Sequence, residues 1–133
     1  MIEHTTEFRV RYAETDQMGI AHHSNYIIWF ELARVRLMES VGISYKDLEA
    51  EGFQMPVLEA KVKYIRYAKF DDVLKVKAAI YNKPKARIDY VYEIKNASDD
   101  IICNGSTQHA FMNKQNKAIK PPAGFLKKMN QLF

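Results

Sequence analysis

Hydrophobic and polar residues alternate along four segments of the chain, and a period of two is typical of β-strands with one solvent-facing side. The alternating segments cover residues 7–12, 58–64, 74–80 and 88–94, and a further apolar run follows at 101–112. Clusters of Asp, Asn, Pro and Lys separate the later segments, as turns would. The pattern predicts five strands, with Gly105 in the last one marking a bulge or a close approach of another group.

After residue 25 the period changes to three and four residues, which is the spacing of one helix face. The residues on this face are Tyr26, Phe30, Ala33, Leu37 and Val41. Ser24 or Asn25 is suited to cap the start of this helix, and Gly42 to end it in a left-handed conformation. Because apolar residues occupy most sides of its first half, we expect the helix to be largely enclosed.

Two shorter helices are predicted from weaker signals. Ser44 and Asp47 resemble a capping box, which predicts a helix over 45–51 that ends at Gly52. Apolar residues after the Pro121-Pro122 pair predict a terminal helix over 125–132. The order of elements indicates one α+β domain over 1–133, in which a small antiparallel sheet curls around the long helix.

Composition narrows the classes of protein that fit. The 133 residues are 47% hydrophobic and 27% charged, as in a globular rather than a disordered protein. Cys103 is the one cysteine and forms no internal disulfide, and Met18–Phe30 is too short and polar to span a membrane. With no basic segment and apolar run at the N-terminus, we expect a cytoplasmic protein. The net charge of +4 suits an anionic small ligand, whereas basic residues spread over the strands do not favour nucleic acid.

Candidate chemistry concentrates in the loop before the long helix. Asp16 is a potential base or nucleophile, and Gly19 permits unusual backbone angles or close approach of a ligand. The start of the following helix directs free N–H groups toward this loop. An acid beside such N–H groups suits acyl transfer, because negative charge develops on a carbonyl oxygen during the reaction.

The same stretch resembles a known enzyme family. The run Val10-Arg-Tyr-Ala-Glu-Thr-Asp16-Gln-Met-Gly19-Ile-Ala-His-His23-Ser-Asn25-Tyr26, followed by Phe30-Glu31 and Arg34, is similar to hotdog-fold acyl-CoA thioesterases of the 4-hydroxybenzoyl-CoA thioesterase type. The branch associated with the Tol-Pal system is especially similar. The resemblance implies a hotdog fold: a five-stranded antiparallel sheet wrapped around a long central helix.

The resemblance also implies roles for particular residues. Asp16 matches the catalytic carboxylate, which either attacks the thioester carbonyl or activates water. His23 matches the residue whose backbone N–H polarises the carbonyl, Gly19 matches the glycine that lets the loop close, and Asn25 and Tyr26 complete the expected substrate-binding motif.

Substrate and assembly follow from the resemblance as well. The expected substrate is an acyl-CoA, or an acyl carrier protein thioester, and no cofactor is expected. Lys83, Lys85 and Arg87 lie at a turn that relatives use for the nucleotide end of coenzyme A. The family implies a dimer or tetramer with each site built between subunits.

Other polar residues receive structural interpretations. We expect Glu14 to be solvated and Glu31 to form an i, i+3 ion pair with Arg34. We expect no metal at His22 and His23, because adjacent side chains point apart and no third ligand lies at a suitable spacing.

Two alternatives to a thioesterase stay open. A hotdog dehydratase would need a His-x-x-Gly type of loop, whereas His22 and His23 are followed by Ser-Asn. A non-catalytic module that binds acyl ligands or a partner is compatible with the mildly basic composition.

Overall fold

A computed structural model describes residues 1–133. The strands are β1 (Ile2–Arg9), β2 (Val57–Tyr64), β3 (Val73–Ile80), β4 (Ile88–Asn96) and β5 (Ile101–His109). The helices are the 3₁₀ turn η1 (Tyr12–Glu14), α1 (Asn25–Ser40), α2 (Tyr45–Ala50) and α3 (Ala123–Asn130). All strand pairs are antiparallel, and the sheet order is β1-β3-β4-β5-β2.

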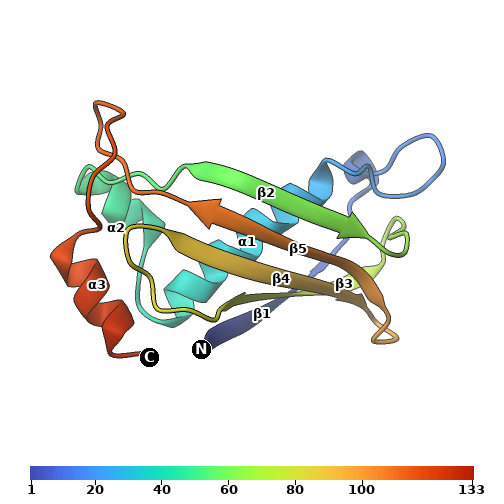
Figure 1. The fold of residues 1–133 in the computed structure, drawn as a ribbon. Coiled ribbons are helices and arrows are strands. Elements are labelled where there is room, and N and C mark those ends of the chain that lie inside the picture. Colours follow the sequence, from blue (N-terminus) through green and yellow to red (C-terminus); the bar gives the residue numbers. More distant parts are fainter.

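The long helix α1 packs against one face of this sheet, and α2 and α3 lie together at one end (Figure 1). The Phe30 ring of α1 stacks on Tyr92 of β4, with centroids 4.3 Å apart. A Cβ at Gly105 would overlap the Phe30 ring and lie 2.8 Å from the Lys61 carbonyl oxygen. The predicted close approach at Gly105 is therefore confirmed, and the α+β fold with a five-stranded antiparallel sheet is confirmed too.

The helix ends agree in part with the sequence pattern. Gly42 ends α1 with φ +80°, as predicted, and the Ser44 hydroxyl accepts a hydrogen bond from the Asp47 amide at the start of α2. The expected side-chain cap of α1 was wrong, because the Ser24 hydroxyl bonds to the ring of His22 instead.

Two strands also differ from the prediction by three residues or more at an end. β1 spans Ile2–Arg9 rather than 7–12, because the chain turns into η1 when the Glu14 carboxylate accepts a hydrogen bond from the Arg11 amide. β5 ends at His109 rather than Met112, and Met112 instead forms isolated bridges to Gln54 and Ala118.

The sheet does not enclose α1 on all sides. Ile27 and Ile28 are 41% and 53% exposed, so the expectation of a largely enclosed helix was wrong for the face turned away from the sheet. β2 lies at one edge of the sheet and is exposed along nearly its whole length. In a single chain, this face of α1 and the outer edge of β2 are therefore both uncovered. None of the helices has the length and apolar character required to cross a membrane.

Candidate active site

The loop between β1 and α1 is fixed to the connection between β2 and β3. The Val10 amide donates to the Asp72 carbonyl at 3.0 Å, and the Ala21 amide donates to the Ala68 carbonyl at 2.8 Å. Thr15 pairs with Ala21 in an antiparallel bridge. The loop is therefore a hairpin held by backbone hydrogen bonds, which limits the positions its side chains adopt.

Asp16 lies at the tip of this hairpin. Its Oδ1 accepts a hydrogen bond from the Met18 amide at 2.8 Å, and its carbonyl accepts one from the Gly19 amide at 3.0 Å. Gly19 has φ +77°, a conformation that costs glycine little and other residues more. The second carboxylate oxygen, Oδ2, has no hydrogen-bond partner in the chain, and the residue is partly exposed. The carboxylate is thus oriented through one oxygen and available through the other.

The start of α1 presents an unused donor. The His22 amide donates to Glu14 and the Asn25 amide to the His22 carbonyl, but the His23 amide donates to no acceptor. The His22 carbonyl, which is in the same peptide unit as this N–H, accepts hydrogen bonds from the Asn25 amide at 3.0 Å and the Asn25 side chain at 3.1 Å, and the Tyr64 hydroxyl of β2 donates to the next carbonyl, that of His23, at 3.0 Å. A fixed, unpaired N–H at a helix start is the kind of donor that stabilises a developing oxyanion.

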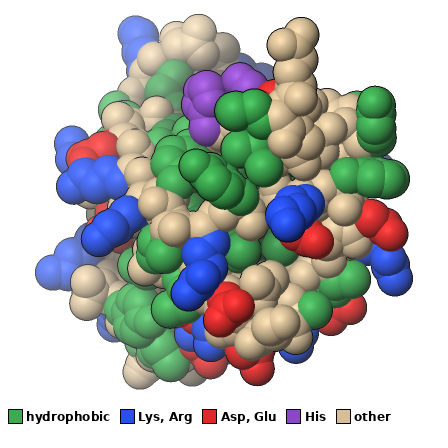
Figure 2. Space-filling model, turned by 90° about the vertical axis from the view of Figure 1, so that its right-hand side faces the viewer, with side chains coloured by type: hydrophobic (Ala, Val, Ile, Leu, Met, Phe, Trp, Pro, Cys, Tyr) green, Lys and Arg blue, Asp and Glu red, His purple; other side chains and the backbone are tan.

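The two histidine rings lie against each other, with centroids 4.1 Å apart, so the expectation that they point apart was wrong. Figure 2 views this end of the molecule and shows histidine side chains next to hydrophobic ones. Hydrophobic side chains at this end include Tyr12 and Phe70, which are 77% and 54% exposed and meet edge to face.

Glu14 is a member of this site that the sequence interpretation placed in solvent. The residue is buried, and its carboxylate accepts hydrogen bonds from the Arg11 amide at 2.8 Å and from Trp29 Nε1 at 2.7 Å. Burial raises its pKa, but these bonds and the charge of Arg11 outweigh that effect and leave the pKa lowered. The expectation of a solvated Glu14 was therefore wrong; its position two residues before Asp16, with Trp29 in the second turn of α1, was the available signal.

Asn25 and Tyr26 hold the loop rather than face an open substrate surface. The Asn25 side chain donates to the carbonyl oxygens of Glu14 and His22. Tyr26 is 3% exposed and packs against Trp29 and Tyr64. Both side chains are engaged within the chain, and a direct contact with substrate stays a prediction for them.

The predicted nucleotide-binding residues are remote from Asp16 in the same chain. Arg9, next to the loop, pairs with Val73, whereas the turn with Lys83, Lys85 and Arg87 follows Ile80 at the other end of β3. Seven residues of extended strand span about 24 Å. Lys83 and Lys85 line a cavity with Lys120, and Arg87 donates to the Gln108 side chain. Within one chain, the structure does not bring these residues to the candidate active site.

Residues 10–129 match the model of the thioesterase-like superfamily. The chain belongs to this superfamily, and the prediction from the 10–26 motif is confirmed. Among curated relatives, a Bacillus subtilis protein named "Putative acyl-CoA thioesterase YneP" is 32% identical over 86% of this chain and 82% of its own length. The Escherichia coli protein named "Acyl-CoA thioester hydrolase YbgC" is 28% identical over 71% of this chain and 70% of its own.

The fold agrees with that of solved members. A DHNA-CoA thioesterase from Staphylococcus aureus superposes with a TM-score of 0.94 and 32% identity, covering 99% of this chain and 91% of the other. The five-stranded sheet with one long helix is thus the hotdog fold of this superfamily.

Proposed function

We propose that this hotdog protein hydrolyses an acyl-CoA thioester to the free acid and coenzyme A, with Asp16 as the catalytic carboxylate. The observation that carries the proposal is that one hairpin and the helix start that follows it hold two complementary groups. These are the Asp16 carboxylate, which has one oxygen without a hydrogen bond, and the His23 amide, which has no acceptor. The names of the relatives, YneP, YbgC and the Staphylococcus aureus enzyme, support the same chemistry.

Both routes open to Asp16 use these groups in the same places. As a base, the carboxylate takes a proton from water while the water oxygen attacks the carbonyl carbon, and the thiolate leaves and gains a proton. As a nucleophile, it forms a mixed anhydride and expels the thiolate, after which water splits the anhydride. In either route the His23 amide donates to the carbonyl oxygen as negative charge develops on it. Loss of one such donor typically costs on the order of a hundredfold or more in rate.

A second copy of the chain is the partner that we propose for β2. Unpaired edge strands expose backbone donors and acceptors and favour pairing with another strand. Along β2, Leu58 and Tyr64 are each 48% exposed, and Ile27 and Ile28 on α1 extend the exposed apolar surface. Pairing two β2 edges would cover this surface; whether dimers assemble further into tetramers is part of the same prediction.

Lys83 and Lys85 are too far from Asp16 of their own chain to bind a coenzyme A held there. Under this proposal they act at the site of another subunit. We propose that Lys83, Lys85 and Arg87 bind the phosphates of a coenzyme A held at another subunit's Asp16. A Lys83→Glu/Lys85→Glu variant should raise KM for an acyl-CoA but leave turnover of the same acyl group on N-acetylcysteamine unchanged, because the latter thiol carries no nucleotide.

The test of the central proposal is Asp16→Asn. This change keeps the size and the acceptor for the Met18 amide, so folding and oligomer size should persist while thiol release falls at least a hundredfold. Asp89→Asn, an exposed acid at the start of β4, is the matched control and should retain full activity.

Normal turnover by Asp16→Asn would exclude Asp16 as the catalytic residue. If a 3-hydroxyacyl thioester yields an alkene, the activity is that of a dehydratase. If no thioester in a broad panel releases thiol, yet acyl-CoAs raise Tm, the protein binds acyl ligands without hydrolysis. A cytoplasmic location, and the choice between CoA and acyl carrier protein substrates, remain predictions.

A further inference from the structure

Arg34 of α1 is a buried charge with unused hydrogen-bond donors. Its side chain is 8% exposed, and its Nε and Nη1 atoms have no hydrogen-bond partner. The predicted ion pair with Glu31 is present, but Nη2 and the carboxylate oxygen are 3.8 Å apart and the Glu31 side chain is 63% exposed. Burying a guanidinium with only a distant, solvated counterion is costly unless another group completes its hydrogen bonds.

The Tyr45 and Tyr92 hydroxyls lie beside the guanidinium, and its charge counteracts part of the rise in pKa that burial causes in both tyrosines, but Nε and Nη1 stay without a hydrogen-bond partner. The Tyr45 hydroxyl bonds to that of Tyr90 at 3.0 Å, and the Tyr92 hydroxyl bonds to Thr107 at 2.6 Å. His109 continues the second chain by bonding to the same Thr107 hydroxyl. These groups are neutral, so none of them balances the charge of Arg34, and none is a hydrogen-bond partner of its Nε or Nη1.

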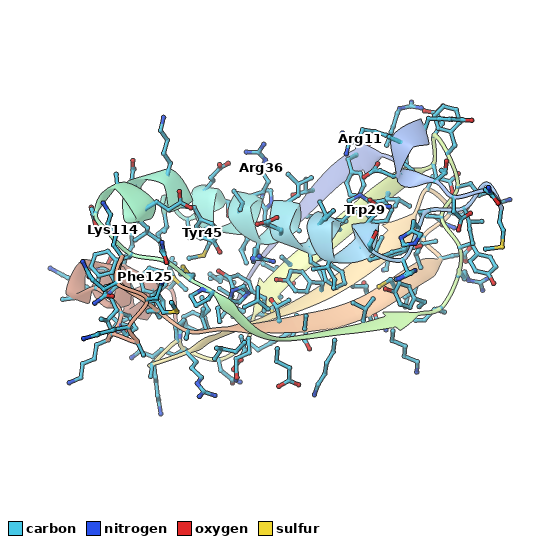
Figure 3. All side chains as sticks on the ribbon, turned by 90° about the horizontal axis from the view of Figure 1, so that it is seen from above. Arg11, Trp29, Arg36, Tyr45, Lys114 and Phe125 are labelled. Atoms are coloured by element: carbon cyan, nitrogen blue, oxygen red, sulfur yellow. The ribbon has the colours of Figure 1, made fainter.

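Arg34 borders a cavity of about 140 Å³ between α1, α2 and the segment that leads into β2. Leu48, Phe53 and Met55 form its apolar wall, and Tyr45 and Gln54 are among its polar residues. Figure 3 shows Tyr45 toward the end of α1 remote from Trp29 and Arg11, which mark the helix start. The cavity has room for a few non-hydrogen atoms and has a polar, cationic side.

One stripe of α1 connects this cavity with the candidate active site. Ile27, Glu31 and Arg34 follow one another at intervals of four and three residues, so they share a helix flank. At 1.5 Å per residue, the helix rises about 14 Å from Asn25 to Arg34, and the arginine side chain leans back toward the helix start. An acyl chain whose thioester carbonyl accepts from the His23 amide, and which lies along this flank, would extend toward the cavity.

From this geometry we infer that Arg34 selects acyl groups that carry an oxygen acceptor, either a carboxylate or a hydroxyl, at the end remote from the thioester. The inference rests on the proposed thioesterase function and names its substrate class. A guanidinium presents a planar fork of donors that matches such oxygens. A plain hydrocarbon end leaves the two donors unpaired, and sites built to bond a polar group discriminate strongly against analogues that lack it.

The experiment uses matched substrates of one chain length: octanoyl-CoA against its ω-hydroxy and ω-carboxy forms. The wild-type protein should show kcat/KM at least tenfold higher for an oxygen-bearing member than for its plain counterpart. The ω-hydroxy and ω-carboxy arms decide whether the acceptor is neutral or ionised. In Arg34→Met this ratio should fall to within about threefold, because the variant lacks the donors that bind the oxygen. A tenfold preference corresponds to about 1.4 kcal/mol.

Two variants keep the test interpretable. Arg36→Met removes an exposed arginine of the same helix, paired with Glu39, and should keep the wild-type ratio. Arg34→Gln retains some donor capacity and serves if Arg34→Met fails to fold, as judged by circular dichroism; it should reduce the ratio without removing it.

A binding measurement distinguishes failure of this inference from failure of the proposed function. Calorimetric titration of Asp16→Asn with the same acyl-CoAs should show the same preference, and the double variant Asp16→Asn/Arg34→Met should lose it. If nothing is hydrolysed but the binding preference depends on Arg34, the proposed function fails and the selectivity stands. Equal values for paired substrates in the wild type, or a preference that survives both Arg34 variants, would overturn the inference.

Discussion

The Glu14 carboxylate and the Trp29 indole are joined by a 2.7 Å hydrogen bond that connects the η1 turn to the first half of α1. The same carboxylate accepts the Arg11 amide, and the Glu14 carbonyl accepts the His22 amide and the Asn25 side chain. Glu14 therefore holds both ends of the hairpin that carries Asp16. Figure 3 shows Trp29 and Arg11 at this end of the helix.

We predict that Glu14→Gln destabilises the protein and lowers turnover. The amide of Gln offers one oxygen where the carboxylate serves two donors, so one buried donor loses its acceptor, at a cost of about 1–3 kcal/mol. Urea unfolding followed by Trp29 fluorescence measures the stability, since Trp29 is the one tryptophan in the chain.

Glu7→Gln, an exposed acid on β1, is the control and should leave stability and turnover unchanged. In a double-mutant cycle, followed by circular dichroism because Trp29→Phe removes the fluorophore, Trp29→Phe should remove part of the effect of Glu14→Gln, because the two residues share the bond. Full additivity would contradict the role assigned to this bond.

Lowering the pH should reduce the free energy of unfolding, because His109 binds a proton more readily in the unfolded chain than in the folded one. Burial, aided by the charge of Arg34, lowers the pKa of this histidine from 6.5 to about 4, against opposing effects of the Met55 carbonyl and Asp89. Between these values the unfolded chain binds more protons than the folded one, so the stability contribution is complete above pH 6.5 and is lost as pH falls toward 4. The loss is on the order of 3 kcal/mol.

Unfolding free energies at pH 7, 6, 5 and 4.5, at constant protein concentration, check this slope. A His109→Gln variant should flatten it over that range. An unchanged slope in the variant would assign the acid sensitivity to other groups.

The glycine in β5 should tolerate no side chain. Gly105→Ala places a methyl group against the Phe30 ring and the Lys61 carbonyl, and overpacking of this kind typically costs about 1–3 kcal/mol. Gly124→Ala in α3 meets no atom within 4 Å and should be neutral or stabilising. Thermal unfolding of the pair gives the comparison, and equal Tm values would show that the sheet and α1 adjust to the added methyl group.

The oligomeric state should depend on the exposed edge of β2. Leu58→Asp introduces a charge on the exposed strand and should shift light-scattering mass toward the monomer, with loss of activity if sites are shared between subunits. Leu58→Thr keeps strand propensity without a charge and should retain the assembly. A wild-type protein that is monomeric at micromolar concentration would refute the proposed interface.

The sequence by itself determined the element order and the family to which the chain belongs. Strict alternation around Val62, Val76 and Tyr92 and the helical period from Tyr26 to Val41 are local signals, and the structure has strands and a helix there. Gly42 and Gly105 were recognisable because glycine readily adopts the left-handed conformation that ends a helix, and because it weakens a strand unless close packing requires it. The 10–26 motif identified the family because its spacing, too, is local.

Only the tertiary structure decided which groups meet. The burial of Glu14 depends on Trp29, fifteen residues away, and the unpaired state of Arg34 depends on how α2 and the start of β2 close around it. The separation of Lys83 from Asp16 depends on strand register. Periodicity reports which face of an element is apolar, but hydrogen bonding and burial depend on contacts between segments distant in the chain, and the pattern of one segment carries no record of them.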